Sequence, residues 1–448
     1  MRCLGVFCGR QVECPFVMYL IYTALVALGL LFGMPYWLFH MLGDHKYRAG
    51  LTERLGRIPD RLLPPVGRNS IWVHAVSVGE VLAVSRLIDE IQKCYPERRI
   101  FVSTTTDTGQ KLAGQRFGQE NVFYFPLDLP CAIRPYLNLL KPGLVILAET
   151  EFWPNFLRMA RQSGARIAVV NARISDRSRR GYRIARSLMA RTLENVSVFL
   201  AQTETDRTRL AEIGAPADRV QVSGNLKFDV ASPSPPPIVE RLQDAFEKTN
   251  AGPIIVAGST MDGEELLLLR GFEIVRGRHA RAVMIIAPRH PQRFQQVSEL
   301  ITSLGLPMWR RSLWSGENLG GGVLVLDSIG ELAAIYALGD LAFVGGSLVE
   351  HGGHNILEPA QHGVATLIGP HYDNFRDMVN LFRAADAVQI VGPAELPLAF
   401  VDLVSNPAEC QALGRRAVET LRTQAGATQK TLQALREFLD QPNKNEPT

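Results

Sequence analysis

The chain has 448 residues and a mass of 49.6 kDa, roughly three times a typical domain, so we expect at least two globular units. Hydrophobic residues make up 46% and charged residues 21%, which excludes a disordered, collagenous or disulfide-scaffold chain. The 48 basic and 44 acidic side chains give a net charge of only +4, a balance that does not predict a nucleic-acid-binding protein.

The cysteines and histidines show no metal-binding or disulfide pattern. The six cysteines contain no CxxC pair, which predicts reduced thiols in a reducing compartment. They are Cys3, Cys8, Cys14, Cys94, Cys131 and Cys410. Histidines such as His290, His351 and His354 are scattered without HExxH spacing, so we expect no metal ion.

The N-terminal segment 1–43 is apolar. Between Glu13 and Asp44 lie 30 residues without a formal charge, more than the ~20 that cross a bilayer as a helix. We expect a membrane anchor over about 16–42; the alternatives are a helix lying on the membrane or an apolar docking helix. Basic residues follow the stretch, and the positive-inside rule then places the rest of the chain in the cytoplasm.

The remainder alternates short β-rich runs with amphipathic helical stretches, which is typical of parallel sheets covered on both faces. One such unit is expected over 44–230, with strands such as SIWVHAV and GLVILAE, and a second over 251–425, with strands such as PIIVAGS and LAFVGG. A proline-rich stretch at 231–250 is expected to be a stiff linker, and 426–448 a C-terminal helix and tail. Two doubly wound domains would bind ligands in the cleft between them, beyond the carboxyl ends of their strands.

Glu80 lies in SVGE, where the strand SIWVHAV turns into a helix. The helix macrodipole would keep this carboxylate ionised at neutral pH, so that it could accept a proton from a sugar hydroxyl. The alternative is a charge that merely stabilises the helix N-terminus.

A second strand ends in AETEFWPNF, where period-2 alternation would point Glu149 and Glu151 in the same direction if the strand continued. The alternative is helix capping ahead of Pro154. Lys227 in GNLKFD ends the last strand of the first domain, near the hinge, although a strand-end lysine can also be an ordinary solvated residue.

An arginine-rich stretch runs from Arg173 to Arg191 with a single aspartate. Helical spacing would place Arg179, Arg183 and Arg186 on one face, and guanidinium groups bind phosphate in a bidentate manner. A solvated or membrane-facing helix surface is the alternative.

In the second domain, the strand-to-helix junctions APRHPQRF, DSIGELAAIY and GGSLVEHGGHNILEPA define one face. Asn355 would cap a helix whose third residue is Glu358, and a nucleotide phosphate would fit that N-terminus. The Glu358 carboxylate would accept a hydrogen bond from a ribose hydroxyl, or it would only complete the capping box.

Together these motifs resemble the 3-deoxy-D-manno-octulosonic acid (Kdo) transferases of lipopolysaccharide synthesis, which are inverting glycosyltransferases with the GT-B fold. The resemblance rests on HAVSVGE, ETEFWPN, NARISDRS, GNLKFD, APRHPQRF, GEL and GGSLVEHGGHNILEPA, in family order over nearly the whole chain. It implies transfer of Kdo from CMP-Kdo to the lipid A precursor at the cytoplasmic side of the inner membrane, without metal or cofactor.

The resemblance also assigns roles residue by residue. Glu80 would be the proton acceptor, and Glu149 and Lys227 would stabilise the transition state. CMP would contact Pro288, Arg289, Ile329, Gly330, Glu331, Asn355, Ile356, Leu357 and Glu358. The acceptor phosphates would meet Arg173, Arg179, Arg183 and Arg186.

Two other functions fit the same motifs. Another GT-B transferase could use a different nucleotide sugar to build a cell-envelope lipid. A membrane-tethered nucleotide sensor on the same pair of domains would tolerate Glu80→Gln, whereas a transferase would not.

Overall fold

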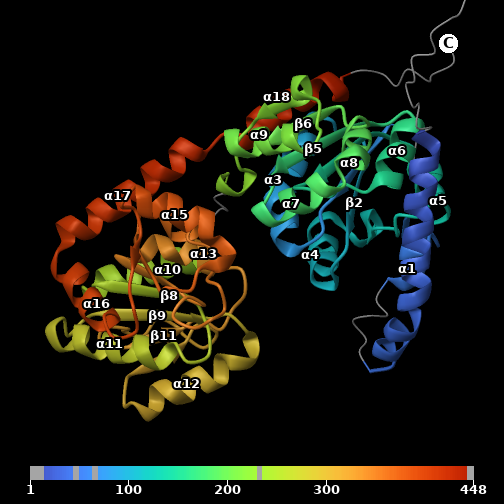
Figure 1. The fold of residues 1–448 in the computed structure, drawn as a ribbon. Coiled ribbons are helices and arrows are strands. Elements are labelled where there is room, and N and C mark those ends of the chain that lie inside the picture. The colour runs from blue at the N-terminus through green and yellow to red at the C-terminus, as the bar shows by residue number, and fades with distance from the viewer. Residues whose placement is uncertain (1–14, 44–49, 63–68, 230–234, 441–448) are drawn as a thin grey trace, which may run out of the picture. The chain divides into compact units, whose positions relative to one another are not determined.

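The computed structural model describes residues 15–43, 50–62, 69–229 and 235–440, apart from the side chains of 15, 16, 34–43, 177, 183 and 184. The chain forms two compact units (Figure 1). Unit 1 comprises Met1–Asp229 and Gly426–Thr448, and unit 2 comprises Val230–Ala425.

Unit 1 is built on a seven-stranded sheet in the order β3-β2-β1-β4-β5-β6-β7, in which all neighbours pair in parallel. The strands are β1 (Ser70–His74), β2 (Ile100–Thr104), β3 (Val122–Tyr124), β4 (Pro142–Ala148), β5 (Arg166–Ala172), β6 (Val198–Ala201) and β7 (Val220–Val222). The helices are α1 (Pro15–Gly43), α2 (Leu51–Arg54), α3 (Val78–Cys94), α4 (Asp107–Phe117), α5 (Pro130–Leu140), α6 (Pro154–Gln162), α7 (Asp176–Ile184), α8 (Arg186–Leu193), α9 (Glu204–Glu212) and α18 (Ala427–Leu439).

Both faces of this sheet are buried. Alternate residues of each strand point to opposite sides and therefore enter two different cores. Trp72 and Phe101 face a core completed by α5, α6, α8 and α9. Ile71 and Val73 face a second core completed by α3, α4 and α18. This double burial explains why the strands are continuous apolar runs in the sequence.

Unit 2 repeats the architecture with the strand order β10-β11-β9-β8-β12-β13-β14, again with parallel pairing. Its strands are β8 (Ile254–Thr260), β9 (Val283–Pro288), β10 (Met308–Arg310), β11 (Val323–Val325), β12 (Leu341–Val344), β13 (Ala365–Ile368) and β14 (Gln389–Ile390). Its helices are α10 (Pro237–Thr249), α11 (Glu265–Arg278), α12 (Phe294–Ser303), α13 (Leu332–Ile335), α14 (Leu357–Ala360), α15 (Arg376–Ala384), α16 (Leu396–Ser405) and α17 (Pro407–Gln424). The expectation of two doubly wound parallel-sheet units is confirmed.

The predicted linker at 231–250 is wrong over most of its length, since Pro237–Thr249 forms α10. Pro237 occupies the first helical turn, where a missing N–H does no harm, and Ile238, Leu242 and Phe246 are buried in unit 2. Residues 230–234 lie outside the described part of the chain.

The C-terminal helix α18 belongs to unit 1, although it follows unit 2 in the sequence. Leu432, Leu435 and Leu439 enter the core beside α3. Asp229 accepts hydrogen bonds from the backbone N–H groups of Gly426, at 2.7 Å, and Thr428. These bonds cap the start of α18.

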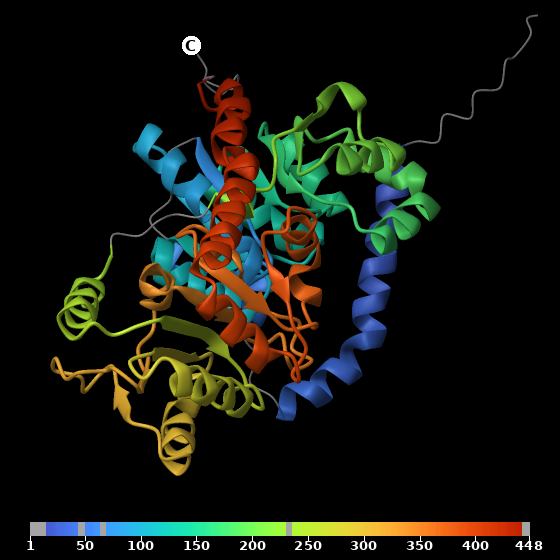
Figure 2. The same cartoon turned by 90° about the vertical axis from the view of Figure 1, so that its left-hand side faces the viewer.

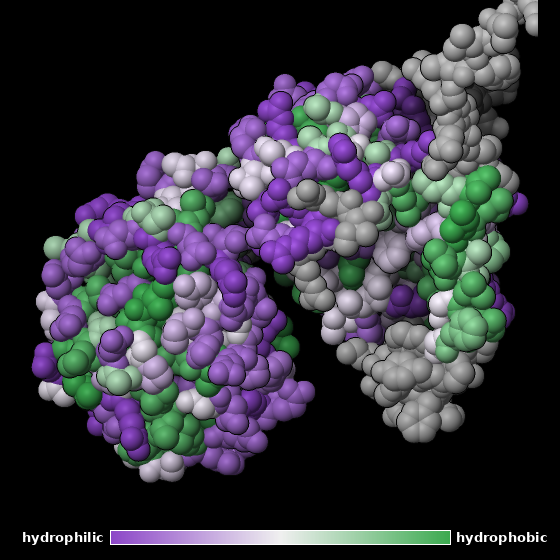
Figure 3. Space-filling model, in the orientation of Figure 1, coloured by the Kyte–Doolittle hydropathy of each residue, from purple (hydrophilic) through white to green (hydrophobic). Residues whose placement is uncertain are grey.

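Helix α1 lies along the outside of unit 1 (Figures 1 and 2). The Tyr19 hydroxyl donates to the carbonyl of Arg191 at 3.3 Å, and the Asn155 amide donates to the Thr23 hydroxyl at 2.9 Å. The opposite face is apolar and exposed, with Leu25 63% and Phe32 78% accessible (Figure 3).

Among the described residues, no helix combines the length and the hydropathy needed to cross a membrane. The anchor expected over about 16–42 stays a prediction, because the side chains of 34–43 lie outside the described part.

Candidate active site

The carboxylates of interest in unit 1 lie at its topological switch point. From β1 the chain proceeds to β2 on one side, and from β4 it proceeds to β5 on the other. Glu80 follows β1 and Glu149 follows β4, so both lie beyond the carboxyl ends of these neighbouring strands. Ligands of doubly wound sheets bind at such a point.

Glu80 is held by the N-terminus of α3. Ser77 is the N-cap, and its hydroxyl donates to Glu80 Oε1 at 3.2 Å, while the backbone N–H of Val76 donates to Oε2 at 2.8 Å. Glu80 therefore has the structural role that the capping alternative describes, since its carboxylate accepts hydrogen bonds from two residues of the turn before α3.

The electrostatics of Glu80 differ from the expectation of a carboxylate kept fully ionised. Burial raises the pKa of Glu80 to about 7, the Val76 hydrogen bond opposes this rise, and the charges of Glu149 and Glu151 add to it. Desolvation and two like charges thus outweigh the stabilisation that the N-terminus of α3 gives to the ionised carboxylate. A pKa near 7 is nonetheless well matched to a proton acceptor at neutral pH.

Glu149 and Glu151 do not follow the predicted strand alternation. Strand β4 ends at Ala148, and Glu149 has a φ of 56°, a left-handed conformation that costs a non-glycine residue roughly 1–2 kcal/mol. Glu149 Oε1 forms an ion pair with Lys227 Nζ at 2.9 Å, whereas Glu151 Oε2 accepts from Trp153 Nε1 at 2.9 Å. Burial, together with the Glu149 charge, raises the pKa of Glu151.

Lys227 is placed by a residue that the sequence interpretation did not single out. It lies on the short 3-10 helix η5 (Leu226–Phe228), after β7, rather than at the end of a strand. The Asn171 Oδ1 atom accepts the backbone N–H of Leu226 at 2.9 Å, and Asn171 itself has a φ of 54°. The sequence signal for this role is an asparagine directly after the apolar residues of a strand, as in AVVNAR, because Asn tolerates the left-handed backbone conformation better than most residues.

The predicted arginine face is not a single helical face. Ala185, with φ −96° and ψ 28°, separates α7 from α8, so Arg179 lies on α7 and Arg186 begins α8. Arg179 forms an ion pair with Glu212 at 2.6 Å, while Arg173 and Arg186 are exposed. The side chain of Arg183 lies outside the described residues.

In unit 2, the predicted CMP-binding residues follow three strands of the same sheet. Pro288 ends β9 and Arg289 follows it, Ile329–Glu331 follow β11, and Asn355–Glu358 follow β12. Because the strands are parallel, these segments lie at one end of the sheet. The fold therefore places residues up to 70 positions apart in the sequence, from 288 to 358, at the same end of one sheet.

The segment around Asn355 differs in detail from the prediction. Helix α14 has only four residues, and Ile356, not Asn355, is its N-cap, so the expected macrodipole is small. Asn355 still organises the turn, since its Oδ1 accepts the N–H of Leu357 at 3.1 Å and its amide contacts Glu358 Oε1 at 3.5 Å.

Arg289, which follows β9, lies close enough to this segment for its charge to affect the pKa values of two residues there. Burial raises the pKa of Glu358, and the Asn355 hydrogen bond and the Arg289 charge oppose the rise. Burial, with the Arg289 charge, lowers the pKa of His354 to about 4, so this imidazole is neutral at pH 7. Arg289 therefore supplies positive charge close to this segment.

The segment Ile329–Glu331 is fixed by an ion pair. Arg311 binds Glu331 through two hydrogen bonds of 2.8 and 2.6 Å, and the Ser328 hydroxyl also donates to Glu331. Ile329 is 82% exposed, and Gly330 has a φ of 90°, which favours glycine. Glu331 thus holds the loop, leaving Ile329 and the backbone of Gly330 open to a ligand.

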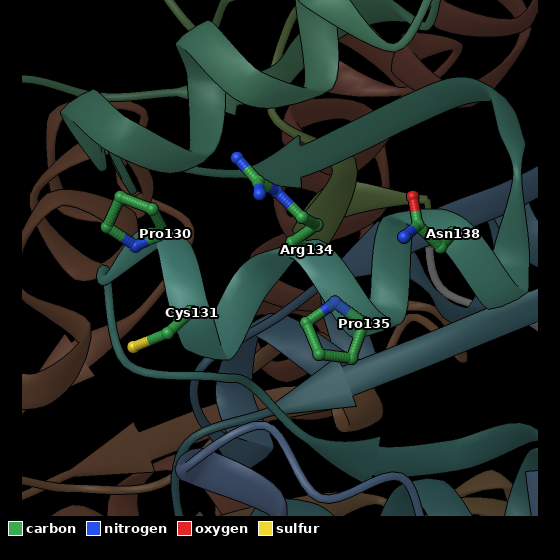
Figure 4. A pocket seen from close by; sticks show the side chains of 5 residues that line it. All are labelled: Pro130, Cys131, Arg134, Pro135 and Asn138. Atoms are coloured by element: carbon green, nitrogen blue, oxygen red, sulfur yellow. The ribbon is translucent and has the colours of Figure 1, made fainter.

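Within the described part of the chain, no group of three or more His, Cys, Asp or Glu side chains could hold a metal ion. A surface hollow of about 500 Å³ lies on α5 (Figure 4). It is lined by Pro130, Cys131, Arg134, Pro135 and Asn138, all from that helix. The predicted site residues are not among them.

Comparisons with known proteins agree with these motifs. A family model described as 3-deoxy-D-manno-octulosonic-acid transferase (kdotransferase) matches residues 49–230. A 3-deoxy-D-manno-octulosonic acid transferase from Haemophilus influenzae is 32% identical over 400 residues, which are 88% of this chain and 92% of that protein. One from Bordetella pertussis is 34% identical over 398 residues, 86% of this chain and 91% of that protein.

Among solved structures, a UDP-GlcNAc 2-epimerase from Neisseria meningitidis bound to UDP-GlcNAc is similar with a TM-score of 0.52 and 14% identity. The match covers 82% of this chain and 100% of that one. At this identity the likeness concerns the GT-B-like fold alone.

Proposed function

Because the chain belongs to the 3-deoxy-D-manno-octulosonic acid transferase family, we propose that it transfers Kdo from CMP-Kdo to a lipid A precursor, with Glu80 as proton acceptor. Membership makes the protein a glycosyltransferase of lipopolysaccharide biosynthesis that transfers Kdo. The donor nucleotide, the acceptor and the residue roles are our proposal.

The observation that carries the mechanism is the carboxylate cluster of Glu80, Glu149 and Glu151, with Lys227 bound to Glu149 at 2.9 Å. In the proposed step, the acceptor hydroxyl oxygen bonds to the anomeric carbon of Kdo as the bond from that carbon to the CMP phosphate breaks. The hydroxyl proton passes to Glu80, and the bonding electron pair leaves with CMP. A carboxylate whose pKa is about 7 can take that proton near neutral pH.

Lys227 and Glu149 are proposed to stabilise the transition state as an oriented pair. The ion pair and the hydrogen bond from Leu226 to Asn171 hold the ammonium group in place before the substrate arrives. Such preorganised charge lowers a barrier more than a mobile side chain does, because little reorganisation is left to the reaction.

On the donor side, Arg289 would bind the single phosphate of CMP and Glu358 would accept a hydrogen bond from a ribose hydroxyl. Pro288 and the loop Ile329–Glu331 would contact the base. Arg289 supplies a charge-assisted contact, and a monophosphate leaving group needs less neutralisation than a diphosphate. This assignment involves no metal ion.

The acceptor phosphates are proposed to meet the exposed Arg173 and Arg186, with Arg179 and Arg183 as further candidates in the same stretch. Arg179 can take part only by leaving Glu212.

We also place the enzyme at the inner membrane, with both units on the cytoplasmic side. Helix α1 supports this, since its polar side is hydrogen-bonded to unit 1 while Leu20, Leu25 and Phe32 are exposed. An apolar face of this kind suits the acyl boundary of a bilayer, where the acceptor lipid resides.

The proposal is tested with the purified full chain, CMP-Kdo and a bis-phosphorylated lipid A precursor, by mass spectrometry of the lipid product and calorimetry of CMP and UDP. The expected result is a lipid heavier by one or more Kdo residues and binding of CMP in preference to UDP. Preference for UDP, or an unchanged lipid, would instead favour another nucleotide sugar and acceptor.

A further inference from the structure

Glu264 is a fully buried carboxylate that the mechanism above does not use. It lies between β8 and α11, in the AGSTMDGEE junction. Its accessible fraction is 0%, and a carboxylate at that depth requires strong hydrogen-bonding partners. The neighbouring Glu265 has a different environment, with its Oε1 bound by Thr260 and Arg293 side chains.

The partners of Glu264 are four backbone N–H groups. Met261, at 2.8 Å, and Gly346, at 2.7 Å, donate to Oε2. Ser347, at 3.0 Å, and Leu348, at 2.9 Å, donate to Oε1. Three of the donors belong to the turn after β12, so that consecutive N–H groups converge on one anion. Backbone turns of this shape are anion-binding concavities, and here the anion is the protein's own side chain.

Glu264 and its N–H donors lie where a doubly wound domain commonly binds a phosphate. Strands β8 and β12 are neighbours at the topological switch point of unit 2, where nucleotide phosphates commonly bind in doubly wound domains. Glu264 occupies the N–H groups that a phosphate would otherwise use. A donor phosphate would therefore use other groups at this end of the sheet, among them Arg289, which follows β9.

The turn is connected directly to the predicted donor-binding segment. The Gly346 carbonyl accepts the N–H of Gly353 at 2.7 Å. Gly346 has a φ of 69°, and a Cβ atom there would lie 2.9 Å from the His354 ring. The Ser347 hydroxyl donates to the Val344 carbonyl at 2.6 Å and accepts the N–H of Gly369 at 2.8 Å. Displacement of the turn would thus move Gly353 and His354, which directly precede Asn355.

We propose that Glu264 is a positioning residue that holds the turn Gly345–Leu348 in its anion-binding shape and thereby orders the donor-binding segment Gly353–Glu358. The inference rests on the proposed function, because it takes Asn355–Glu358 as part of the CMP site. Glu264 itself does not touch the donor.

Substitution of Glu264 by Gln provides the first test, because an amide has one acceptor oxygen and turns its NH2 group toward N–H donors. The full-length Glu264→Gln variant is expected to bind CMP roughly tenfold or more weakly, with a raised KM for CMP-Kdo and a kcat little changed. Glu265→Gln is the matched control, since it is the adjacent residue and equally buried, yet bonded away from the turn. This control is expected to keep the wild-type CMP affinity even if it lowers the melting temperature.

Chemical rescue separates positioning from general destabilisation. In Glu264→Ala, 100 mM formate should restore part of the CMP affinity by refilling the N–H turn, whereas the neutral isostere formamide should not; the concentration is on the order of what a weak carboxylate site requires. Equal effects of formate and formamide would overturn the proposal.

A measurement on the wild type remains decisive if the variants do not fold. Amide hydrogen exchange should show Gly346, Ser347 and Leu348 protected in the absence of nucleotide, because each is bonded to a buried carboxylate. Rapid exchange at all three amides would refute the proposal, as would Glu264→Gln binding CMP like the wild type. Failure of the wild type to bind CMP would instead reject the proposed donor, and the exchange result would still decide the role of Glu264.

Discussion

The switch points of the two sheets have the same topology but opposite chemistry. In unit 1, the residues after β1 and β4 are Glu80 and Glu149, and only one cation, Lys227, is bound to this carboxylate pair in the described structure. In unit 2, the acid after β8, Glu264, is saturated by four backbone N–H groups, three of them from the turn after β12. The Glu80 carboxyl is buried close to two like charges and can accept a proton near neutral pH, whereas the Glu264 carboxylate holds a backbone turn.

This difference suggests a division of labour between the units. Unit 1 would accept the proton, because burial, together with the charges of Glu149 and Glu151, raises the pKa of Glu80 to about 7. Unit 2 would hold the donor, because the positive charge of Arg289 acts on its donor-binding segment and the Glu264 carboxylate is already hydrogen-bonded by four backbone N–H groups. Substitutions in the two units should therefore alter different kinetic parameters.

The largest effect is expected for Glu80→Gln. Gln keeps an acceptor for the Val76 N–H but cannot take a proton, so kcat should fall by ~10² or more while CMP affinity stays unchanged. Steady-state kinetics and calorimetry measure the two quantities. Glu90→Gln, on the same helix α3, is the control and should retain full activity. Near-normal turnover of Glu80→Gln would end its assignment as the base.

Arg289→Ala is the counterpart in unit 2. Loss of the charge-assisted phosphate contact should raise the KM for CMP-Kdo by about tenfold or more, with a smaller change in kcat. Arg383→Ala, an exposed arginine on α15, serves as the control. If Arg289→Ala instead lowered kcat and left KM unchanged, the proposed division between the units would be lost.

A smaller effect is expected in the arginine-rich stretch. Arg186 is exposed, so Arg186→Ala should raise the KM for a bis-phosphorylated acceptor several-fold, roughly the value of one partly solvated ionic contact. Arg179→Ala should have less effect, since Glu212 already binds that guanidinium. Acceptors with and without phosphates are compared on both variants. The same KM ratio for the two acceptors in wild type and variants would show that these arginines do not recognise phosphate.

The smallest effects concern the charge balance around Glu80. Glu149→Gln removes a like charge, which should lower the pKa of Glu80 and move the acid limb of the kcat/KM profile to lower pH. Lys227→Met removes the cation, so the same limb should move to higher pH. Both shifts are expected to be about one pH unit or less, and they are measured on whatever activity remains. Shifts in the same direction would show that the Glu80 carboxyl does not sense this pair.

Much of the architecture could be predicted from the sequence, because strands buried on both faces must be apolar throughout and the chemical residues must follow them. The predicted site residues Glu149 and Arg289 each come directly after such a run, and Glu80 lies in the first turn of the helix that follows β1. The conformation of Glu149 was not predictable by alternation, since the strand ends one residue earlier and the backbone turns into the left-handed region.

Other features depend on contacts that periodicity does not encode. Four prolines lie at 233–237, and this proline-rich stretch did not predict the amphipathic helix α10, which begins at the last of them, Pro237. The break at Ala185 has no glycine or proline to mark it. Glu264 resembled any acid in a strand-to-helix junction, because three of its four partners come from a turn some 80 residues later. The raised pKa of Glu80 depends on burial and on the charges of Glu149 and Glu151, and only the fold creates these surroundings.

The most direct test of the central claim is the pH dependence of kcat/KM for the wild type beside the residual activity of Glu80→Gln. A general base must be ionised, so the wild-type rate should rise with pH along a limb centred near 7 and level off above it. The Glu80→Gln rate should show no such limb over the same range. A variant that kept the limb at the same midpoint would mean that another group accepts the proton, and that the unit 1 carboxylates do not perform the chemistry assigned to them.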